Sequence, residues 1–141
     1  MQIKITRVDK SLPLPEYQTP GAVAFDMYSR IDAEIAPAEL CVLPSNLIIQ
    51  VPEGHVLIMA NRSSGPRKGI TLPNGVGVID QDYNGPEDEI KIVVYNFKTE
   101  KITIKRGDRI AQGLIVPIVR AEFFEGEPAR KDSRGGLGST G

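Results

Sequence analysis

The sequence predicts an all-β fold, a sandwich or a barrel, built as one domain. Its apolar residues fall into many short runs that are separated by glycine or proline. No long stretch repeats its apolar residues with the 3.6-residue period of a helix, so we expect helix to be scarce. The chain of 141 residues is of ordinary size for one domain, and it contains no internal repeat.

Each strand is expected where apolar residues alternate or cluster between turn residues. The proline-rich stretch Ser11–Pro20 cannot form regular structure. The segment Gly21–Ser29 that follows is small and apolar, with a single acid, Asp26, that we expect to be buried. Residues 121–131 are charged and are expected to be irregular. The expected strands are Met1–Val8, Leu40–Leu43, Leu47–Val51, His55–Met59, Ile90–Phe97, Lys101–Lys105 and Ile110–Val116.

The stretch Leu72–Ile92 is interpreted as a hairpin that carries chemistry. Strand-forming residues flank a polar segment that holds the two carboxylates Asp80 and Asp82 and the phenol of Tyr83. Functional groups are often placed at the end of a rigid hairpin. A solvated acidic turn is the alternative reading of the same residues.

Composition limits the classes of function. The net charge of -1 argues against a general nucleic-acid binder, although local basic clusters can still bind phosphates. The single cysteine, Cys41, lies in an apolar run and is expected to pack in the core, in a protein of a reducing, cytoplasmic compartment. The single histidine, His55, has no partner for a zinc site. We expect no signal peptide and no membrane helix. Catalysis would therefore use carboxylates, arginine, serine and a hard metal ion.

Three further segments have two readings each. The segment Asn61–Gly65 can bind a phosphate through consecutive backbone N–H groups, serine hydroxyls and Arg62, or it is a plain serine-rich turn. The segment Arg106–Arg109 matches a cell-adhesion tripeptide, or it is a turn with an internal ion pair. The tail Arg134–Gly141 has four glycines in eight residues and either closes over an anionic ligand or frays.

Five segments together give a specific resemblance to a known family. The chain resembles the homotrimeric dUTPases, and the match spans nearly the whole sequence. The resemblance implies a single-domain, jelly-roll-like β-barrel (the β-clip type) over residues 1–129. Residues 130–141 would be a flexible glycine-rich arm that closes over an active site shared between subunits. The matching segments are Gly21–Ser29, Asn61–Ser64, Gly77–Gly85, Arg106–Gln112 and Arg134–Gly141.

The resemblance implies hydrolysis of dUTP to dUMP and pyrophosphate, which keeps uracil out of DNA and supplies dUMP for dTMP synthesis. Asp80 would be the general base for a water that attacks the α-phosphorus in line. Ser63 would donate to the oxygen between the α- and β-phosphates, and Arg62 and Gln112 would hold phosphate oxygens. Mg²⁺ would bind the triphosphate, and Asp26 would reach the metal through water. No nucleic-acid or membrane partner is implied.

The same resemblance implies how the nucleoside is recognised. Main-chain groups of the hairpin would read the uracil edge, and the tight turn would exclude a thymine methyl. Asn74 would contact the base, and Tyr83 would pack under the sugar and exclude a 2′-hydroxyl. The other substrate-binding residues implied are Asn61, Ser64, Gly77, Val78, Gly85, Ile90, Lys91, Arg134, Leu137, Gly138 and Ser139.

Three features depart from the common family pattern. Leu137 stands where most members have a phenylalanine that stacks on the uracil. Arg134 directly precedes two glycines, two residues later than the usual tail arginine, so Lys131 or Arg130 could replace it at the γ-phosphate. Pro86–Asp88 lengthens the hairpin and Gly113 lengthens the last strand, and a bulge could absorb either insertion.

Two other functions fit parts of the pattern. A dCTP deaminase would share the fold and an arginine–serine–serine turn, and Glu89 would then be the residue to consider as its base. A catalytically silent trimeric β module that binds nucleotide is the second alternative. The segment Asp80–Tyr83 and the tail ending Gly138–Gly141 favour the dUTPase.

Overall fold

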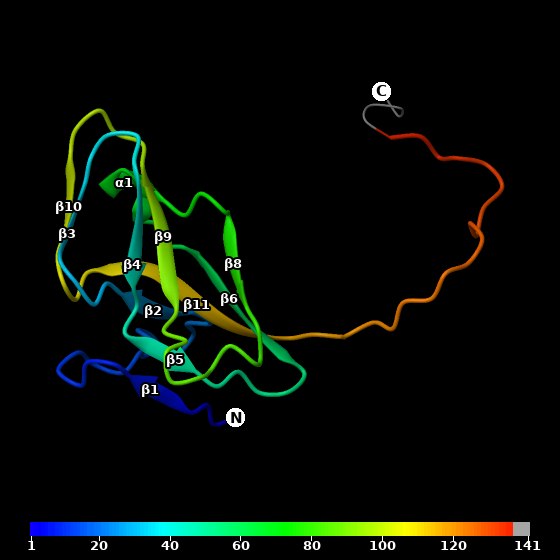
Figure 1. Cartoon of the computed structure of the whole chain (residues 1–141), viewed down its shortest axis with the longest axis horizontal. Coiled ribbons are helices and arrows are strands. Elements are labelled where there is room, and N and C mark those ends of the chain that lie inside the picture. The colour runs from blue at the N-terminus through cyan, green and yellow to red at the C-terminus, as the bar shows by residue number, and fades with distance from the viewer. Residues whose placement is uncertain (137–141) are drawn as a thin grey trace.

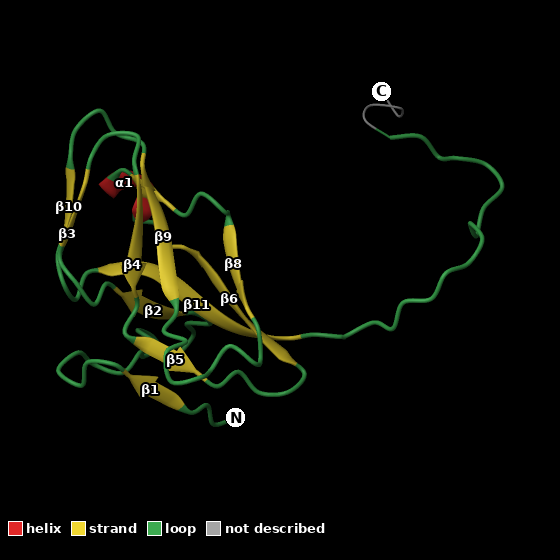
Figure 2. Ribbon diagram, viewed as in Figure 1, coloured by secondary structure: helices red, strands yellow, loops and turns green. Residues whose placement is uncertain are grey.

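Antiparallel strands surround one apolar core, which confirms the predicted all-β class (Figures 1 and 2). The computed structural model describes residues 1–136 of the chain. In this part of the chain the strands are β1 (Ile5–Arg7), β2 (Phe25–Tyr28), β3 (Ala33–Ile35), β4 (Leu40–Pro44), β5 (Leu47–Ile49), β6 (His55–Asn61), β7 (Ile70–Thr71), β8 (Val76–Ile79), β9 (Lys91–Asn96), β10 (Ile102–Ile104) and β11 (Arg109–Pro117), with one short helix, α1 (Gly65–Lys68).

Two sheets carry most of the core. The larger sheet has the strand order β2-β11-β6-β8, and the second has the order β4-β9-β7. The remaining strands form the pairs β1-β5 and β10-β3. Alternate residues of β9, among them Ile92 and Val94, are fully buried, as expected for a strand with one face on the core. Leu57 and Met59 of β6 contribute from the opposing sheet to the same core cluster.

The long strand β11 owes its close packing to a glycine. A Cβ atom on Gly113 would lie 2.6 Å from the Cζ atom of Phe25 on β2, so a larger residue would displace the Phe25 ring. The pairing of β11 with β2 shifts register between Arg109 and Ala111, which is the kind of irregularity expected near the extra residue. The other lengthened segment closes locally, since the Gly85 N–H donates to Asp88 Oδ2 at 2.6 Å.

The expected hairpin over Leu72–Ile92 is wrong as a pairing, although both of its strands exist. Strand β8 pairs with β6, whereas β9 pairs with β4 and β7, so the two strands belong to different sheets. The connection from β8 to β9 is too long for a tight turn, and its last residue is hydrogen-bonded to another strand. The Ile90 N–H donates to Leu47 O of β5 at 2.9 Å, and the next residue, Lys91, pairs with Pro44 of β4 in the second sheet.

Three strands and the helix were not expected from the sequence. Strand β2 is buried on both faces and includes the acid Asp26, so it lacks the alternation that marks a strand with one wet face. Strands β3 and β7 are short, and α1 is a single turn that Gly69 ends with a positive φ of 85°.

The turn Arg106–Arg109 is confirmed, but its ion pair differs from the expected internal one. Arg106 Nη2 donates to Asp9 Oδ2 at 2.6 Å, and its backbone N–H donates to Asp32 Oδ1 at 2.7 Å. Asp108 instead accepts the backbone N–H of Lys105 within the turn, at 3.0 Å. The motif therefore joins the N-terminal segment to the strand β11 that follows it.

Beyond β11 the chain leaves the barrel as an extended arm (Figure 1). Residues 119–136 are exposed, and the side chains of Phe123 and Phe124 are 96% and 91% exposed. The last strand ends at Pro117, twelve residues before the predicted end of the barrel domain at residue 129. The boundary between barrel and arm at residues 129 and 130 stays a prediction. Within residues 1–136, no helix has the length and apolarity needed to cross a membrane.

Candidate functional site

The first candidate site is a crevice between strands β8 and β9. Its volume is about 320 Å³. Strand β8 is the edge of its sheet, and the Lys91–Val94 part of β9 is paired only with β4, because β7 reaches only Tyr95 and Asn96. Two strand edges therefore present unpaired backbone N–H and C=O groups to the crevice. The lining residues are Met59, Asn74, Gly77, Val78, Ile79, Asp80, Tyr83, Ile90 and Lys91.

Asp80 and Tyr83 lie at the end of this crevice, directly after β8. The Asp80 side chain is exposed, so its carboxylate is accessible to solvent and to a ligand in the crevice. The Tyr83 ring is half-exposed, and its hydroxyl donates to Glu89 O at 3.4 Å. Asn74 lies at the opposite end of β8, where its amide donates to Val76 O at 3.1 Å. Gly77 is buried under Met59, whose Cε would lie 2.9 Å from an added Cβ.

Glu89 is a structural anchor below the crevice and only 5% exposed. Arg30 donates to both of its carboxylate oxygens, at 2.8 and 3.0 Å, and Lys91 Nζ and the Asn46 N–H add contacts at 3.0 and 2.7 Å. Burial alone would raise the pKa of Glu89, but the hydrogen bonds from Arg30, Lys91 and Asn46 outweigh it and lower the pKa to about 2. A carboxylate held in this way is a poor general base.

The second candidate site is a cationic cavity of about 590 Å³ at the Arg62 turn. Asp26, 6% exposed, accepts from Arg62 Nε at 2.6 Å and from Arg109 Nη1 at 3.2 Å. Arg62 Nη1 also donates to Ser64 Oγ at 3.1 Å. The buried acid thus orients two guanidinium groups that an anionic ligand can use. Lining the cavity are Glu16, Gln18, Tyr28, Arg62, Ser64, Lys68, Gly107, Asp108 and Arg109.

Sequence reasoning missed Arg109 and Lys68 as members of this site. A signal was present for Arg109, because an acid expected to be buried, as Asp26 was, needs a cation nearby. Lys68 lies in α1, on the exposed side of the turn that follows Ser64. Its position depends on where that single helical turn is placed, which local sequence did not predict.

Two predicted residues use their side chains to hold the end of β6 in place. Asn61 Oδ1 accepts the Leu72 N–H at 2.8 Å, and Asn61 Nδ2 donates to Thr71 Oγ1 at 3.1 Å. Gln112 Nε2 donates to Asn61 O at 2.9 Å. These bonds place the backbone from which Arg62, Ser63 and Ser64 project, and Ser63 itself is exposed.

The two sites are separate within one chain, and none of residues 1–136 lines both of them. The structure brings Asp80, Tyr83, Asn74 and Lys91 together, and it groups Arg62, Ser64 and Asp26 elsewhere. Arg134 lies on the exposed arm. Of the predicted substrate-binding residues, Leu137, Gly138 and Ser139 lie outside the described residues.

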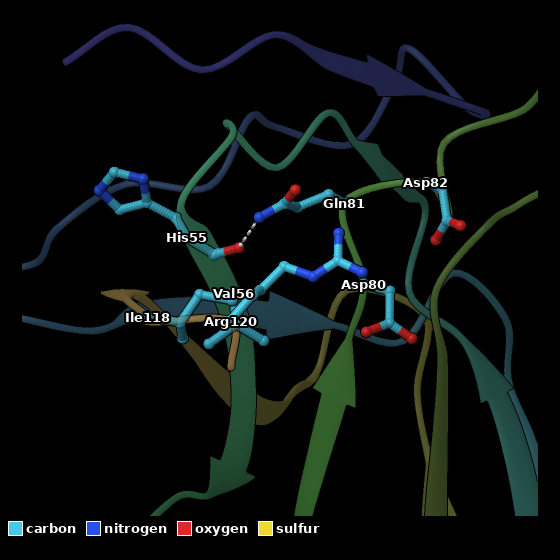
Figure 3. Close-up of a pocket in the computed structure, with 7 residues that line it drawn as sticks. All are labelled: His55, Val56, Asp80, Gln81, Asp82, Ile118 and Arg120. Carbon is cyan, nitrogen blue, oxygen red and sulfur yellow. Dashed lines mark hydrogen bonds between the residues drawn. The ribbon is translucent and has the colours of Figure 1, made fainter. Parts of the chain in front are cut away.

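A third cavity, of about 490 Å³, was not predicted (Figure 3). It lies where β6 begins and just beyond the ends of β8 and β11. Asp80 lines both this cavity and the crevice. Gln81 Nε2 donates to His55 O at 2.9 Å on one of its walls. His55, Val56, Asp80, Gln81, Asp82, Ile118 and Arg120 line it.

The residues of neither site form a metal centre on their own. Within residues 1–136 there is no group of three or more histidine, cysteine, aspartate or glutamate side chains that could hold a metal ion. Both oxygens of Asp26 already accept hydrogen bonds from arginine. This donor set fits only a metal ion whose direct ligands come mainly from a bound substrate.

Comparison with known proteins gives consistent matches over most or all of the chain. The dUTPase family model matches residues 10–141. The deoxyuridine 5'-triphosphate nucleotidohydrolase of Dictyoglomus turgidum is 42% identical over 148 residues, which cover 100% of this chain and 99% of that protein. The crystal structure of the Streptococcus mutans dUTPase superposes with a TM-score of 0.79 at 29% identity, covering 87% of this chain and 100% of that one.

A third match is to the structure of a mutant dUTPase from phage phi11 of S. aureus, described for its coordination of a structural Mg(II) ion. Its TM-score is 0.81 at 22% identity, and it covers 92% of this chain and 99% of the phage chain, which supports the shared fold. The family match and the identity to the bacterial relative cover the residues that line both sites. The chain therefore belongs to the dUTPase family.

Proposed function

We propose that this protein hydrolyses dUTP to dUMP and pyrophosphate, with Asp80 as the general base. The observation that carries the proposal is the exposed Asp80 carboxylate at the end of a crevice formed by two unpaired strand edges. Family membership and the 42% identical nucleotidohydrolase support the same reaction. In the cell the reaction would keep uracil out of DNA and provide dUMP for dTMP synthesis.

The crevice suits a flat base with donors and acceptors on one edge. Unpaired N–H and C=O groups of β8 and β9 can pair with the uracil edge as a neighbouring strand would. Asn74 at one end of β8 can add an amide contact to the base, and the Tyr83 ring at the other end can pack under the sugar. A thymine methyl would have to displace backbone here, which penalises it more than a merely apolar pocket would.

The phosphates of the substrate would bind at the Arg62 turn. Asp80 accepts a proton from the attacking water, while Arg62 and Gln112 hold phosphate oxygens and Ser63 donates to the departing oxygen. Asp26 keeps the Arg62 guanidinium in place through the 2.6 Å hydrogen bond. Asp80 and Ser63 act on opposite sides of the α-phosphorus. In-line attack therefore needs the crevice and the Arg62 cavity to face the same substrate molecule.

We propose Mg²⁺ as the cofactor, bound mainly by the triphosphate. When bound, it would neutralise phosphate charge. Asp26 would reach it through water, because each of its carboxylate oxygens already accepts a hydrogen bond from an arginine. The structural Mg(II) ion of the phage phi11 enzyme shows that a relative of this fold binds the metal.

We propose a homotrimer in which neighbouring subunits share each active site. The separation of the crevice and the Arg62 cavity within one chain supports this assembly. The arm also supports it, because the exposed rings of Phe123 and Phe124 offer apolar surface that another molecule can cover. Residues 130–141 would close over the nucleotide, with Arg134 or its neighbours Arg130 and Lys131 at the γ-phosphate.

The alternative of a dCTP deaminase is disfavoured by Glu89. Its carboxylate is buried and bound by Arg30, Lys91 and the Asn46 backbone, so it has no proton-accepting role open to it.

The experiment that tests the proposed function is a nucleotide panel. We expect pyrophosphate release from dUTP in the presence of Mg²⁺, with dTTP, dCTP and UTP at least ~100-fold poorer in kcat/KM because each violates a contact in the crevice. Release is measured with a coupled pyrophosphate assay, and ammonia is measured in parallel. Ammonia from dCTP would identify a deaminase, and no turnover of any nucleotide would indicate the silent binding module.

Sharing of the site is tested by mixing two inactive variants, Asp80→Asn and Arg62→Gln. Arg62→Gln keeps an N–H donor for Asp26 but loses the cation. If the crevice and the Arg62 turn come from different subunits, random mixing restores about one site in four, since each half must independently be intact. We expect roughly a quarter of wild-type activity after co-refolding, measured against each variant refolded alone. No recovery in trimers shown to be mixed would place both halves in one chain.

A further inference from the structure

One wall of the cationic cavity at the Arg62 turn comes from the proline-rich segment before β2. Glu16 and Gln18 of this segment line the cavity, and both side chains are exposed. Tyr17 lies between them, and its ring packs edge-on against Phe25 of β2 with the ring centroids 6.3 Å apart. This contact attaches the segment to the sheet, although the segment has no regular structure of its own.

Gln18 connects an acid and a cation along this wall. Its Nε2 donates to Glu16 Oε1 at 3.3 Å, and its Oε1 accepts from Arg109 Nη1 at 3.4 Å. Turning the amide over would place an N–H donor against the guanidinium and an acceptor against the carboxylate, so only this orientation satisfies both neighbours. Arg109 Nη1 also donates to Asp26 Oδ2 at 3.2 Å. Glu16 is therefore joined through hydrogen bonds to the arginines of the cavity.

Glu16 keeps a carboxylate oxygen available to a ligand. Within residues 1–136 it makes no ion pair, and its carboxylate accepts one hydrogen bond, from Gln18 to Oε1. Asp26, in contrast, accepts from an arginine at each oxygen, and Asp108 accepts a backbone N–H within its own turn. The charge of Glu16 acts on the cavity, since the pKa of Tyr28, which lines it, is raised first by burial and then by the charges of Asp26 and Glu16.

The acids of this cavity bear on the form of the polyphosphate that it binds. Among residues 1–136 the cations that line it are Arg62, Lys68 and Arg109, and the acids Glu16 and Asp108 line it as well. A polyphosphate without a metal brings only negative charge, which a nearby carboxylate repels. A polyphosphate that carries Mg²⁺ also brings a cation that keeps several waters, and a carboxylate can bind such an ion through those waters.

We propose that Glu16 makes the phosphate cavity selective for polyphosphate in its magnesium-complexed form. The carboxylate disfavours the free form by repulsion and favours the complex through the water shell of the ion. Gln18 holds the carboxylate at the cavity wall through the 3.3 Å hydrogen bond. Because Glu16 is exposed, the selectivity is expected to weaken with salt. The inference rests on the proposed function for the nucleotide, but the selectivity itself can be measured without turnover.

The test is calorimetric binding of inorganic tripolyphosphate to the assembled protein, once with excess Mg²⁺ and once in magnesium-free buffer with EDTA. We expect Glu16→Gln to tighten binding of the free form by about 3-fold and to weaken binding of the magnesium complex by about 2-fold, which is the size of effect that exposed charges have. The ratio of the two dissociation constants then falls by about 6-fold. An unchanged ratio in Glu16→Gln overturns the proposal.

Two further variants separate a local effect of Glu16 from a change in net charge. Glu100→Gln removes one exposed negative charge that does not line the cavity, and it should leave the ratio unchanged. An equal fall of the ratio in Glu100→Gln would overturn the proposal. Gln18→Leu keeps the charge of Glu16 but removes its hydrogen bond, so we expect the ratio to fall part of the way. A wild-type ratio in Gln18→Leu would contradict the role of Gln18.

Turnover of dUTP by the same proteins keeps the two proposals distinct. If the wild type prefers the magnesium complex of tripolyphosphate and Glu16→Gln loses that preference, the inference stands even where dUTP is not hydrolysed, and only the proposed function fails. If the wild type hydrolyses dUTP and Glu16→Gln keeps the wild-type ratio, the inference fails and the proposed function stands. Absence of tripolyphosphate binding in both buffers would show that the cavity is not a phosphate site, and would overturn the inference.

Discussion

Replacing Asp80 by asparagine is expected to lower kcat for dUTP by roughly 10²–10⁴-fold, the usual contribution of a positioned general base. Asparagine keeps the shape of the side chain but cannot accept the proton of the attacking water. The base, sugar and phosphate contacts of the substrate involve other residues, so KM should stay within about 3-fold. Steady-state kinetics with a pyrophosphate assay and equilibrium binding of dUTP measure both effects.

The structure supplies a matched control for this substitution. Asp82 lies two residues away on the same segment and lines the third cavity, but it does not line the crevice. We expect Asp82→Asn to change kcat less than ~10-fold. Near-normal turnover in Asp80→Asn, or an equal loss in Asp82→Asn, would contradict the assignment of the base. Because Asp80 is exposed, its replacement should leave the melting temperature within a few degrees of the wild type.

Replacing Glu89 by glutamine is expected to destabilise the protein by about 3 kcal/mol at pH 7. The pKa of Glu89 is lowered from its usual 4.5 to about 2, because hydrogen bonds from Arg30, Lys91 and the Asn46 N–H outweigh the effect of burial. Glutamine keeps the volume but removes the charge, and it leaves Arg30, only 29% exposed, without its partner. Chemical denaturation at a fixed protein concentration measures the loss.

The pH dependence has a definite sign. A carboxyl whose pKa is lower in the folded state stabilises the protein above its unfolded value, and that contribution disappears as pH falls through the folded value. The stabilisation by Glu89 is therefore fully present above about pH 4.5 and is lost progressively toward pH 2. The Glu89→Gln protein lacks this contribution, so its free energy of unfolding should fall less steeply between pH 5 and pH 2.

An exposed ion pair provides the comparison for Glu89. Lys98 and Glu100 lie 3.5 Å apart with 73% of the Glu100 side chain exposed, so Glu100→Gln should cost less than ~1 kcal/mol. Equal stability of the Glu89→Gln and wild-type proteins would show that the buried cluster is not an anchor. In that case the dCTP deaminase reading of Glu89 would regain support.

Local sequence was sufficient for much of the fold. Strands β6, β9 and β11 were predicted close to their observed bounds because apolar residues alternate or cluster there between turn residues. Asp80 and Tyr83 were predicted to lie on one segment, and both line the crevice, since they come shortly after β8 and need no distant partner to lie close together. Their roles stay predictions. Five segments in the right order were then enough to predict the family.

The tertiary structure alone decided which strands are neighbours. Alternation within β8 and β9 indicates two strands, but their edges pair with β6, β4 and β7, and the gap between them becomes the crevice. Asp26 meets Arg62 and Arg109 from 36 and 83 residues away. Local backbone preference acts over a few residues, whereas strand pairing and burial are set by the whole chain. The sequence therefore determined the strands and the family. The packed fold decided where the charged side chains lie relative to one another.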